Sequence, residues 1–291
     1  MKSVIATAFF LVCLTANAFS LVGLGVATNR PSVATTVNVG EANIPSTLLN
    51  NIAANMTSLL SNTNQTNYYN YLDFGLGTNK QVWTWPVNLS CVGIATNNGP
   101  NDQCTLLSSN LIISAQHIWS AFAPSNSQFI SFKDTNGTPY YAYVTNAVYP
   151  YGDFCLLQIS NAAPNTFVFP SVLPANYTNF YTPKTFSGIW PHRNSNHLVS
   201  VTFTVNAPGA EAFMAGTQVA PFGFDGGASS GDSSSPCFTV VNGNPVILGC
   251  LHTAPGNLPF ISDPVIQAAW FATGLTNGVN FLNLNNYLQL Y

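Results

Sequence analysis

The chain has 291 residues, of which 47% are hydrophobic and only 5% are charged. This apolar content excludes a disordered chain, because disordered proteins are poor in hydrophobic residues. The formal net charge of −3 excludes a basic surface for nucleic acid. The length suits one large domain or two small ones.

The N-terminus has the pattern of a secretory signal peptide. Met1-Lys2-Ser3 supplies a positive start, an apolar run follows over residues 4–14, and Ala16-Asn17-Ala18 supplies a cleavage site of small residues. We therefore expect cleavage after Ala18, a secreted extracellular protein and no membrane contact once the signal is removed. An uncleaved anchor is the alternative, because apolar residues resume over residues 21–26.

Residues 19–80 form an N-terminal extension that contains one predicted helix. The helix spans Ile44 to Leu60, because apolar residues recur there at helical spacing. These residues are Leu48, Leu49, Ile52, Met56, Leu59 and Leu60. The extension is either a pro-segment or a part of the fold that packs on the rest.

From Gln81 onward the sequence is typical of an all-β protein. Short β-branched and aromatic runs alternate with Gly, Pro and Asn, as in a sandwich or a barrel. The predicted strands are Val82–Val87, Leu106–Ser114, Phe129–Phe132, Tyr140–Val144, Phe154–Ile159, Leu198–Val205, Phe238–Val241 and Val246–Leu251. The stretch from Pro264 to Thr273 predicts a short C-terminal helix.

Secretion predicts oxidised cysteines, and two pairs flank predicted turns. Cys91 and Cys104 lie on either side of residues 97–101, and Cys237 and Cys250 lie symmetrically about residues 242–244. Directly opposed residues of a hairpin are close enough for a disulfide. We therefore predict the disulfides Cys91–Cys104 and Cys237–Cys250. The chain has no Cys-x-x-Cys and only four histidines, so no metal site is expected.

Five asparagines lie in sequons for N-glycosylation, which predicts a glycoprotein if the host is eukaryotic. They are Asn55, Asn64, Asn88, Asn136 and Asn176.

Three short segments carry residues for nucleophilic catalysis. They are Ile113-Ser114-Ala115-Gln116-His117, then Asp153-Phe154-Cys155-Leu156-Leu157, then Gly231-Asp232-Ser233-Ser234-Ser235-Pro236. A serine hydroxyl attacks a carbonyl only if a neighbouring imidazole takes its proton. The imidazole in turn needs a carboxylate that holds its tautomer and stabilises its positive charge.

In their order along the chain and in their residue sequences, the three segments resemble those of the chymotrypsin-like (trypsin-fold) serine proteases. The resemblance covers roughly residues 81–260. The resemblance implies two packed antiparallel six-stranded β-barrels, over residues 81–175 and 176–291, with the C-terminal helix on the second barrel. It also implies His117 as the base, Asp153 as the acid and Ser233 as the nucleophile. Backbone amides of Gly231 and Ser233 would form the oxyanion hole, and no cofactor is required.

The resemblance extends to the surroundings of the site. In the family, the strand that here carries His252 and Thr253 lines the specificity pocket. A histidine on this strand is similar to glutamyl endopeptidases and viral 3C-like proteases, and it implies selection of Glu or Gln. Gly227 stands at the pocket base where trypsin-like members have Asp, so cleavage after Lys or Arg is not expected. Asp232 has no Ile-Val-Gly-Gly start at the expected distance before His117 to pair with, so it needs another partner or the enzyme folds active without that switch. Cys155 would be the free, buried cysteine.

Each assignment has an alternative. Asp134 is the competing acid, and the sequence around it predicts an exposed turn. Ser233 could instead be an ordinary residue of the serine-rich stretch 229–235. His252 could be an ordinary strand histidine, and His192 and His197 are read as loop residues.

Ser234 and Ser235 replace two glycines of the family pattern. A side chain at a glycine-only backbone position would distort the turn that carries the nucleophile. The leading hypothesis is thus a secreted serine endopeptidase that acts on a protein or peptide substrate. A protease-fold binding or scaffold protein without activity is the alternative, and blockage of the site by residues 19–80 would make the chain a zymogen. The oligomeric state is not addressed by the sequence.

Overall fold

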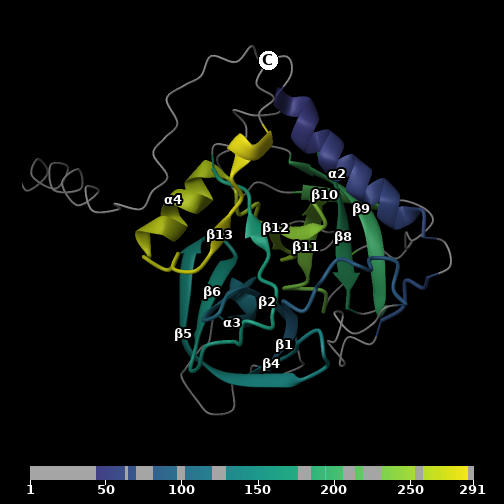
Figure 1. Ribbon diagram of the computed structural model, residues 1–291. Coiled ribbons are helices and arrows are strands. Elements are labelled where there is room, and N and C mark those ends of the chain that lie inside the picture. The colour runs from purple at the N-terminus through teal and green to yellow at the C-terminus, as the bar shows by residue number, and fades with distance from the viewer. Residues whose placement is uncertain are drawn as a thin grey trace, which may run out of the picture. The chain divides into compact units, whose positions relative to one another are not determined.

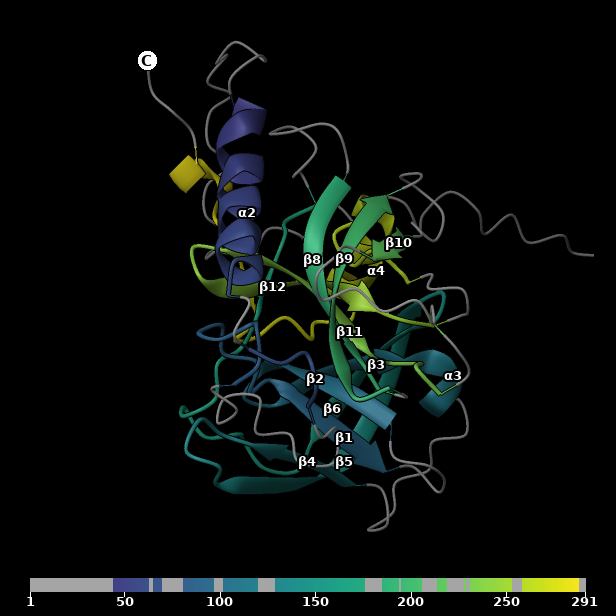
Figure 2. The same ribbon diagram turned by 90° about the vertical axis from the view of Figure 1, so that its right-hand side faces the viewer.

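The computed structural model describes residues 44–62, 65–69, 81–96, 102–119, 129–175, 185–193, 195–205, 214–218, 228, 231–252 and 258–287. Within this part, strands form two bodies, a closed barrel and an open sheet (Figures 1 and 2). In Figure 2 the barrel is the lower body. No described helix is long and apolar enough to cross a membrane.

The barrel contains six antiparallel strands in the order β1-β2-β3-β6-β5-β4. Their bounds are β1 Val92–Thr96, β2 Asp102–Ser108, β3 Leu111–Ala115, β4 Phe129–Lys133, β5 Pro139–Tyr151 and β6 Phe154–Ile159. The strands β2, β3 and β6 are almost entirely buried, as expected for near-continuous apolar runs. The predicted six-stranded first barrel is therefore confirmed.

The second body is a seven-stranded sheet in the order β10-β9-β8-β11-β12-β7-β13. Its strands are β7 Ser171–Val172, β8 Thr185–His192, β9 His197–Val205, β10 Met214–Gln218, β11 Pro236–Val241, β12 Asn244–Cys250 and β13 Asn280–Phe281. The pairs β12–β7 and β7–β13 are parallel. In the described residues this sheet takes the place of the second closed antiparallel barrel that the sequence predicted.

The helix α2 (Ile44–Leu60) is confirmed with the predicted bounds. Its apolar residues Leu48, Ile52, Met56 and Leu59 are buried, and the helix packs on β11 and β8. Figures 1 and 2 both show it along the sheet, on the side away from the one-turn helix α3 (Gln116–Trp119). Residues 44–62 are thus part of the folded body.

The C-terminal helix α4 (Pro264–Ala272) begins after Asp263, whose carboxylate accepts the amide of Val265 at 2.8 Å as an N-cap. The sequence predicted that this helix packs on the second barrel. It does contact that body, because the rings of Trp270 and of Phe281 in β13 are 5.6 Å apart. It also contacts β5 of the first barrel, where the rings of Trp270 and Phe154 are 5.5 Å apart. The helix therefore bridges the two bodies, because its Gln267 also donates to the carbonyl of Leu173 at 2.7 Å.

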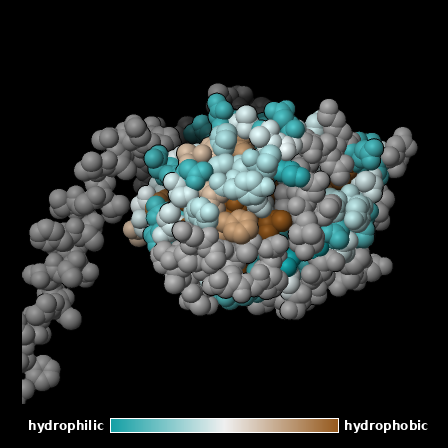
Figure 3. All heavy atoms as spheres, turned by 90° about the horizontal axis from the view of Figure 1, so that it is seen from below, coloured by the Kyte–Doolittle hydropathy of each residue, from teal (hydrophilic) through white to brown (hydrophobic). Residues whose placement is uncertain are grey.

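The outer surface of the barrel is polar with a small hydrophobic area. Seen from below, most of the described surface is pale or teal, and brown atoms form a central patch with a few small spots near the edges of the view (Figure 3). Uncharged polar residues account for this polarity, since only 5% of the chain is charged.

Two predictions about strands were wrong, and one long strand was not predicted. Residues 81–87 form turns with a single bridge at Val82. The predicted strand Leu106–Ser114 is divided into β2 and β3 by a turn at Ser109-Asn110. The strand β8 was not among the predicted strands. A Cβ at Gly188 would lie 2.2 Å from the carbonyl oxygen of Phe238, so glycine permits the close approach of β8 and β11.

Candidate active site

The register of the barrel brings His117 and Asp153 together. Strand β3 pairs with β6 so that Ala115 lies opposite Phe154. Asp153 precedes Phe154 in the two-residue turn between β5 and β6, where Gly152 has a φ of 52°. The chain that leaves β3 enters α3 beside this turn, and the amide of Gln116 donates to the carbonyl of Asp153 at 2.8 Å. The base and the acid therefore come from adjacent strands of one barrel.

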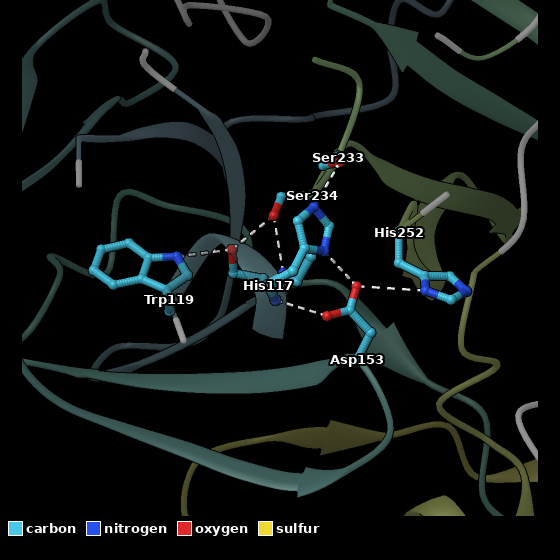
Figure 4. Close-up of polar contacts among 8 residues, drawn as sticks. His117, Trp119, Asp153, Ser233, Ser234 and His252 are labelled. Atoms are coloured by element: carbon cyan, nitrogen blue, oxygen red, sulfur yellow. Dashed lines mark hydrogen bonds and ion pairs between the residues drawn. The ribbon is translucent and has the colours of Figure 1, made fainter. Parts of the chain in front are cut away.

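Asp153 holds both the backbone and the ring of His117. Its Oδ1 accepts the His117 amide at 2.7 Å, and its Oδ2 lies 2.7 Å from Nδ1 of the imidazole. The carboxylate can only accept, so Nδ1 carries the proton and Nε2 presents a lone pair. This lone pair points to Ser233, whose Oγ lies 2.9 Å from Nε2 (Figure 4). The structure thus brings His117, Asp153 and Ser233 together in a continuous hydrogen-bonded chain.

Burial and charge separate the roles of the two titratable groups. The side chain of His117 is 45% exposed and that of Asp153 only 15%. Burial alone would raise the pKa of Asp153, but hydrogen bonds from His117 and His252 outweigh it and hold the pKa at about 2. The hydrogen bond to Asp153 raises the pKa of His117 above its usual value, against the opposing effect of burial. Asp153 is therefore ionised, and its charge makes the imidazole of His117 more basic than that of a free histidine.

Ser234 adopts the glycine-like conformation that its position requires. Its φ of 68° lies in the left-handed region, at a cost of roughly 1–2 kcal/mol for a non-glycine residue. Its hydroxyl accepts the amide of Ala115 at 2.8 Å and lies 2.8 Å from Oγ of Ser114. These contacts link the nucleophile turn to the strand that carries the base. The distortion that the sequence suggested at Ser234 is offset by hydrogen bonds that a glycine would not make.

The turn before the nucleophile is held by a buried arginine. Nη1 of Arg193 lies 2.5 Å from the carbonyl oxygen of Gly231 and 2.6 Å from Oδ1 of Asp102 in the barrel. Gly231 has a φ of 99°, which is open only to glycine. Burial raises the pKa of Asp102, and the adjacent Arg193 partly offsets this rise. The peptide at Gly231, one of the two predicted oxyanion positions, is thereby tied to both bodies.

Asp232 pairs with a histidine that sequence reasoning had assigned to a loop. The two side chains are only 2–3% exposed, and Nε2 of His192 lies 3.3 Å from Oδ2 of Asp232. The amide of Ser195 donates to Nδ1 of His192 at 3.1 Å, so the ring proton is on Nε2 and points to Asp232. His192 was missed because it is separated from the motif by about 40 residues. The lack of an N-terminal partner for Asp232 was the feature of the sequence that indicated another partner for this carboxylate.

His252 lies beside the acid. Its Nδ1 is 3.4 Å from Oδ2 of Asp153, and its side chain is 10% exposed. Figure 4 shows the two imidazoles of His117 and His252 on either side of the Asp153 carboxylate. The assignment of His252 to a specificity pocket stays a prediction, and its predicted companions Gly227 and Thr253 lie outside the described residues.

Asp134, the competing acid, has a structural role. It is buried, not exposed, and its Oδ1 accepts the amides of Asn136 and Thr138 at 2.9 Å each. These contacts close the turn between β4 and β5, as Asp commonly does in turns.

The predicted disulfides are wrong, because all five described cysteines are free. The hairpin β11–β12 turns at Asn242-Gly243, and a bulge shifts the register, so Cys237 opposes Gly249 and Cys250 opposes Pro236. Neighbouring residues of a strand face opposite sides, so the two thiols diverge. In the first hairpin Cys104 opposes Gly93, while the carbonyl of Cys91 accepts the amide of Leu106.

The free thiols are buried, which raises their pKa values and leaves them unreactive. Cys155 is free and buried, as the family resemblance implied. Within the described ranges, no group of three or more His, Cys, Asp or Glu side chains could hold a metal ion.

Comparison with known proteins gives distant structural likeness only. Neither the protein-family models nor the curated proteins contain a match. Among solved structures, human heparin binding protein has a TM-score of 0.48 at 14% identity, covering 67% of this chain and 95% of that one. A mutant of the same protein has a TM-score of 0.46 at 15% identity, covering 65% and 92%.

The scabies mite inactivated protease paralogue S-I1 is also similar, with a TM-score of 0.47 at 14% identity over 65% of this chain and 96% of that one. At such identities and TM-scores these likenesses do not fix a family for this chain. The residues that surround Ser233 therefore carry the functional argument.

Proposed function

We propose that this chain is a serine endopeptidase of the chymotrypsin-like kind. The single observation that carries the proposal is the chain of contacts from Ser233 Oγ to His117 Nε2, at 2.9 Å, and from His117 Nδ1 to Asp153 Oδ2, at 2.7 Å. These lengths lie within the range in which a base and a nucleophile exchange a proton.

In the proposed reaction the Ser233 hydroxyl attacks the carbonyl carbon of a peptide bond. His117 takes the hydroxyl proton at Nε2, and Asp153 stabilises the imidazolium that forms. The tetrahedral intermediate then collapses, and His117 gives the proton to the leaving amine. Water releases the acyl group by the same steps in reverse. Amides at Gly231 and Ser233 would stabilise the oxyanion, and loss of one such donor costs about 100- to 1000-fold in rate.

We further propose that the protein is secreted and acts on protein or peptide substrates, with Glu and Gln as the first residues to test before the cleaved bond. Of the described sequons, Asn136 is exposed and open to glycosylation. Asn55 is a poor candidate, because its Nδ2 donates to the carbonyl of Asn51 at 2.7 Å.

Labelling by a fluorophosphonate probe tests the proposal directly. We expect the purified chain to be labelled covalently, and we expect the Ser233→Ala variant, which removes one oxygen atom, to be unlabelled. The Ser229→Ala variant is a matched control in the same serine-rich stretch and should label like the unchanged chain. Absence of labelling in the unchanged chain would favour the inactive binding protein.

A further inference from the structure

The segment Gln65–Tyr69 of the N-terminal extension, which we call the clamp, pairs with the beginning of β9. The amide of Tyr69 donates to the carbonyl of Asn196 at 2.8 Å, and the carbonyl of Asn67 accepts the amide of Leu198 at 2.7 Å. Both contacts join backbone groups, so they fix the path of the chain at this point. The clamp therefore holds the end of the turn that joins β8 to β9.

The turn between β8 and β9 carries the two side chains that hold the residues before the nucleophile. His192, the last residue of β8, faces Asp232 with 3.3 Å between Nε2 and Oδ2. Arg193 is the next residue, and its Nη1 lies 2.5 Å from the carbonyl oxygen of Gly231. A displacement of this turn would therefore move the supports of both residues that precede Ser233.

Tyr69 anchors the clamp in the protein interior. Its side chain is 1% exposed, and its hydroxyl accepts a hydrogen bond from Nε2 of Gln103 at 2.8 Å. Gln103 follows Asp102 in β2, and Asp102 is the carboxylate that binds Arg193. Burial raises the pKa of Tyr69, and the charges of Asp232 and Arg193 also act on its phenol, in opposite directions. The phenol is therefore neutral, and it belongs to the same buried polar cluster as the supports of the nucleophile turn.

We propose that the clamp keeps the nucleophile turn in the shape that presents the Gly231 amide to the oxyanion, with Tyr69 as its positioning residue. The effect on catalysis rests on the proposed function, whereas the support of the turn does not. Loss of residues 65–69 would lower the activity, which is the opposite of what removal of an inhibitory pro-segment would do.

Amide hydrogen exchange in the full chain, followed by NMR, tests the support of the turn. In Tyr69→Ala the amides of Ser234 and Ser235 should exchange at least about 10-fold faster, because the nucleophile turn opens more often. The amide of Gln116, which is hydrogen-bonded within the barrel, should exchange as before. Unchanged exchange at Ser234 and Ser235 would overturn the proposal, and so would an equal rise at Gln116, which would indicate a loosening of the whole fold.

Tyr68→Phe is the matched control, because it removes a hydroxyl from the neighbouring ring, which is 54% exposed. It should leave all of these exchange rates unchanged. Tyr69→Phe keeps the buried ring and loses the hydroxyl that accepts from Gln103, so it should show the pattern of Tyr69→Ala at a smaller size. If Tyr69→Ala does not fold, Tyr69→Phe decides, and exchange rates equal to those of Tyr68→Phe would overturn the proposal.

Labelling kinetics separate positioning from a purely structural role. In Tyr69→Ala the fluorophosphonate should label Ser233 about 10- to 100-fold more slowly per folded molecule, because the Gly231 donor is misplaced rather than removed. The pH midpoint of labelling should not move, since His117 and Asp153 lie in the barrel. A residue that only stabilises the fold would lower Tm and leave this rate unchanged, which would overturn the positioning role. An unchanged chain that is not labelled at all would refute the proposed function, while hydrogen exchange would still decide whether the clamp supports the turn.

Discussion

The barrel and the seven-stranded sheet position the residues of the proposed active site by different means. The barrel brings His117 and Asp153 side by side through strand register, since Ala115 and Phe154 are paired residues, and the Asp153 carboxylate then holds the amide and the ring of His117. The sheet carries Ser233 in a turn before β11, and side chains tie that turn to the barrel through Ser234 and Arg193. The comparison indicates that the acid and base form a rigid pair, whereas the nucleophile depends on a few contacts between the two bodies.

The largest effect is expected from breaking the pair within the barrel. Asp153→Asn keeps the shape of the side chain but removes the charge that favours the reactive His117 tautomer, so kcat should fall about 10⁴-fold. Steady-state kinetics with a peptide ester measure this loss. Thermal unfolding should show a folded protein, and a variant with near-normal kcat would contradict the role of Asp153.

Breaking the arginine contact between the bodies should come next. Arg193→Met removes the guanidinium from the buried Asp102 and from the Gly231 carbonyl, at a cost of about 3 kcal/mol in the free energy of unfolding. Urea unfolding measures this cost. The double variant Arg193→Met/Asp102→Asn should recover part of it, because no buried charge is then left without its cation. No recovery would indicate that the pair is not the cause.

The pH dependence of the rate tests the acid–base pair without any substitution. Only neutral His117 accepts a proton, and the pKa of His117 is raised above 6.5. The value of kcat/KM should therefore fall tenfold per pH unit well below that raised pKa, with its midpoint above pH 6.5. A raised pKa also means that the contribution of His117 to stability is complete below pH 6.5 and is lost as the pH rises through the folded-state value. A rate midpoint below pH 6.5 would contradict the pair.

The smallest effect is expected at the serine link. Ser234→Ala keeps the unfavourable φ and loses both hydrogen bonds, which should cost about 1–2 kcal/mol in unfolding free energy. Ser234→Gly loses the same bonds but relieves roughly 1–2 kcal/mol of backbone strain, so it should be the more stable of the two variants. Calorimetry of both proteins gives the order, and the reverse order would show that the φ of 68° at Ser234 imposes no such strain.

Local pattern predicted both main helices, and the family resemblance, carried by three short motifs, predicted the first barrel and the residues of the proposed triad. The sequence did not predict the strand β8, whose Gly188 is required by contact with Phe238. The predicted Cys237–Cys250 disulfide was wrong for a related reason, since a bulge and a two-residue turn set the register between β11 and β12 and place the two cysteines opposite other residues. His192, Arg193 and the contact of His252 with Asp153 depend on packing between distant segments. No spacing in the sequence encodes such contacts.

The packing of α2 determines where a shortened form of this protein can begin. The helix covers β8 and β11 with four buried apolar side chains, each of which contributes roughly 2 kcal/mol of hydrophobic stabilisation. A chain that starts at residue 81 lacks α2, so the strip of β8 and β11 that the helix covers would be exposed to water. Such a chain would associate with other copies through this strip. A chain that starts just before Ile44 keeps the strip covered. A cut in the stretch between the helix and Gln81 would leave α2 bound to the sheet as a separate peptide.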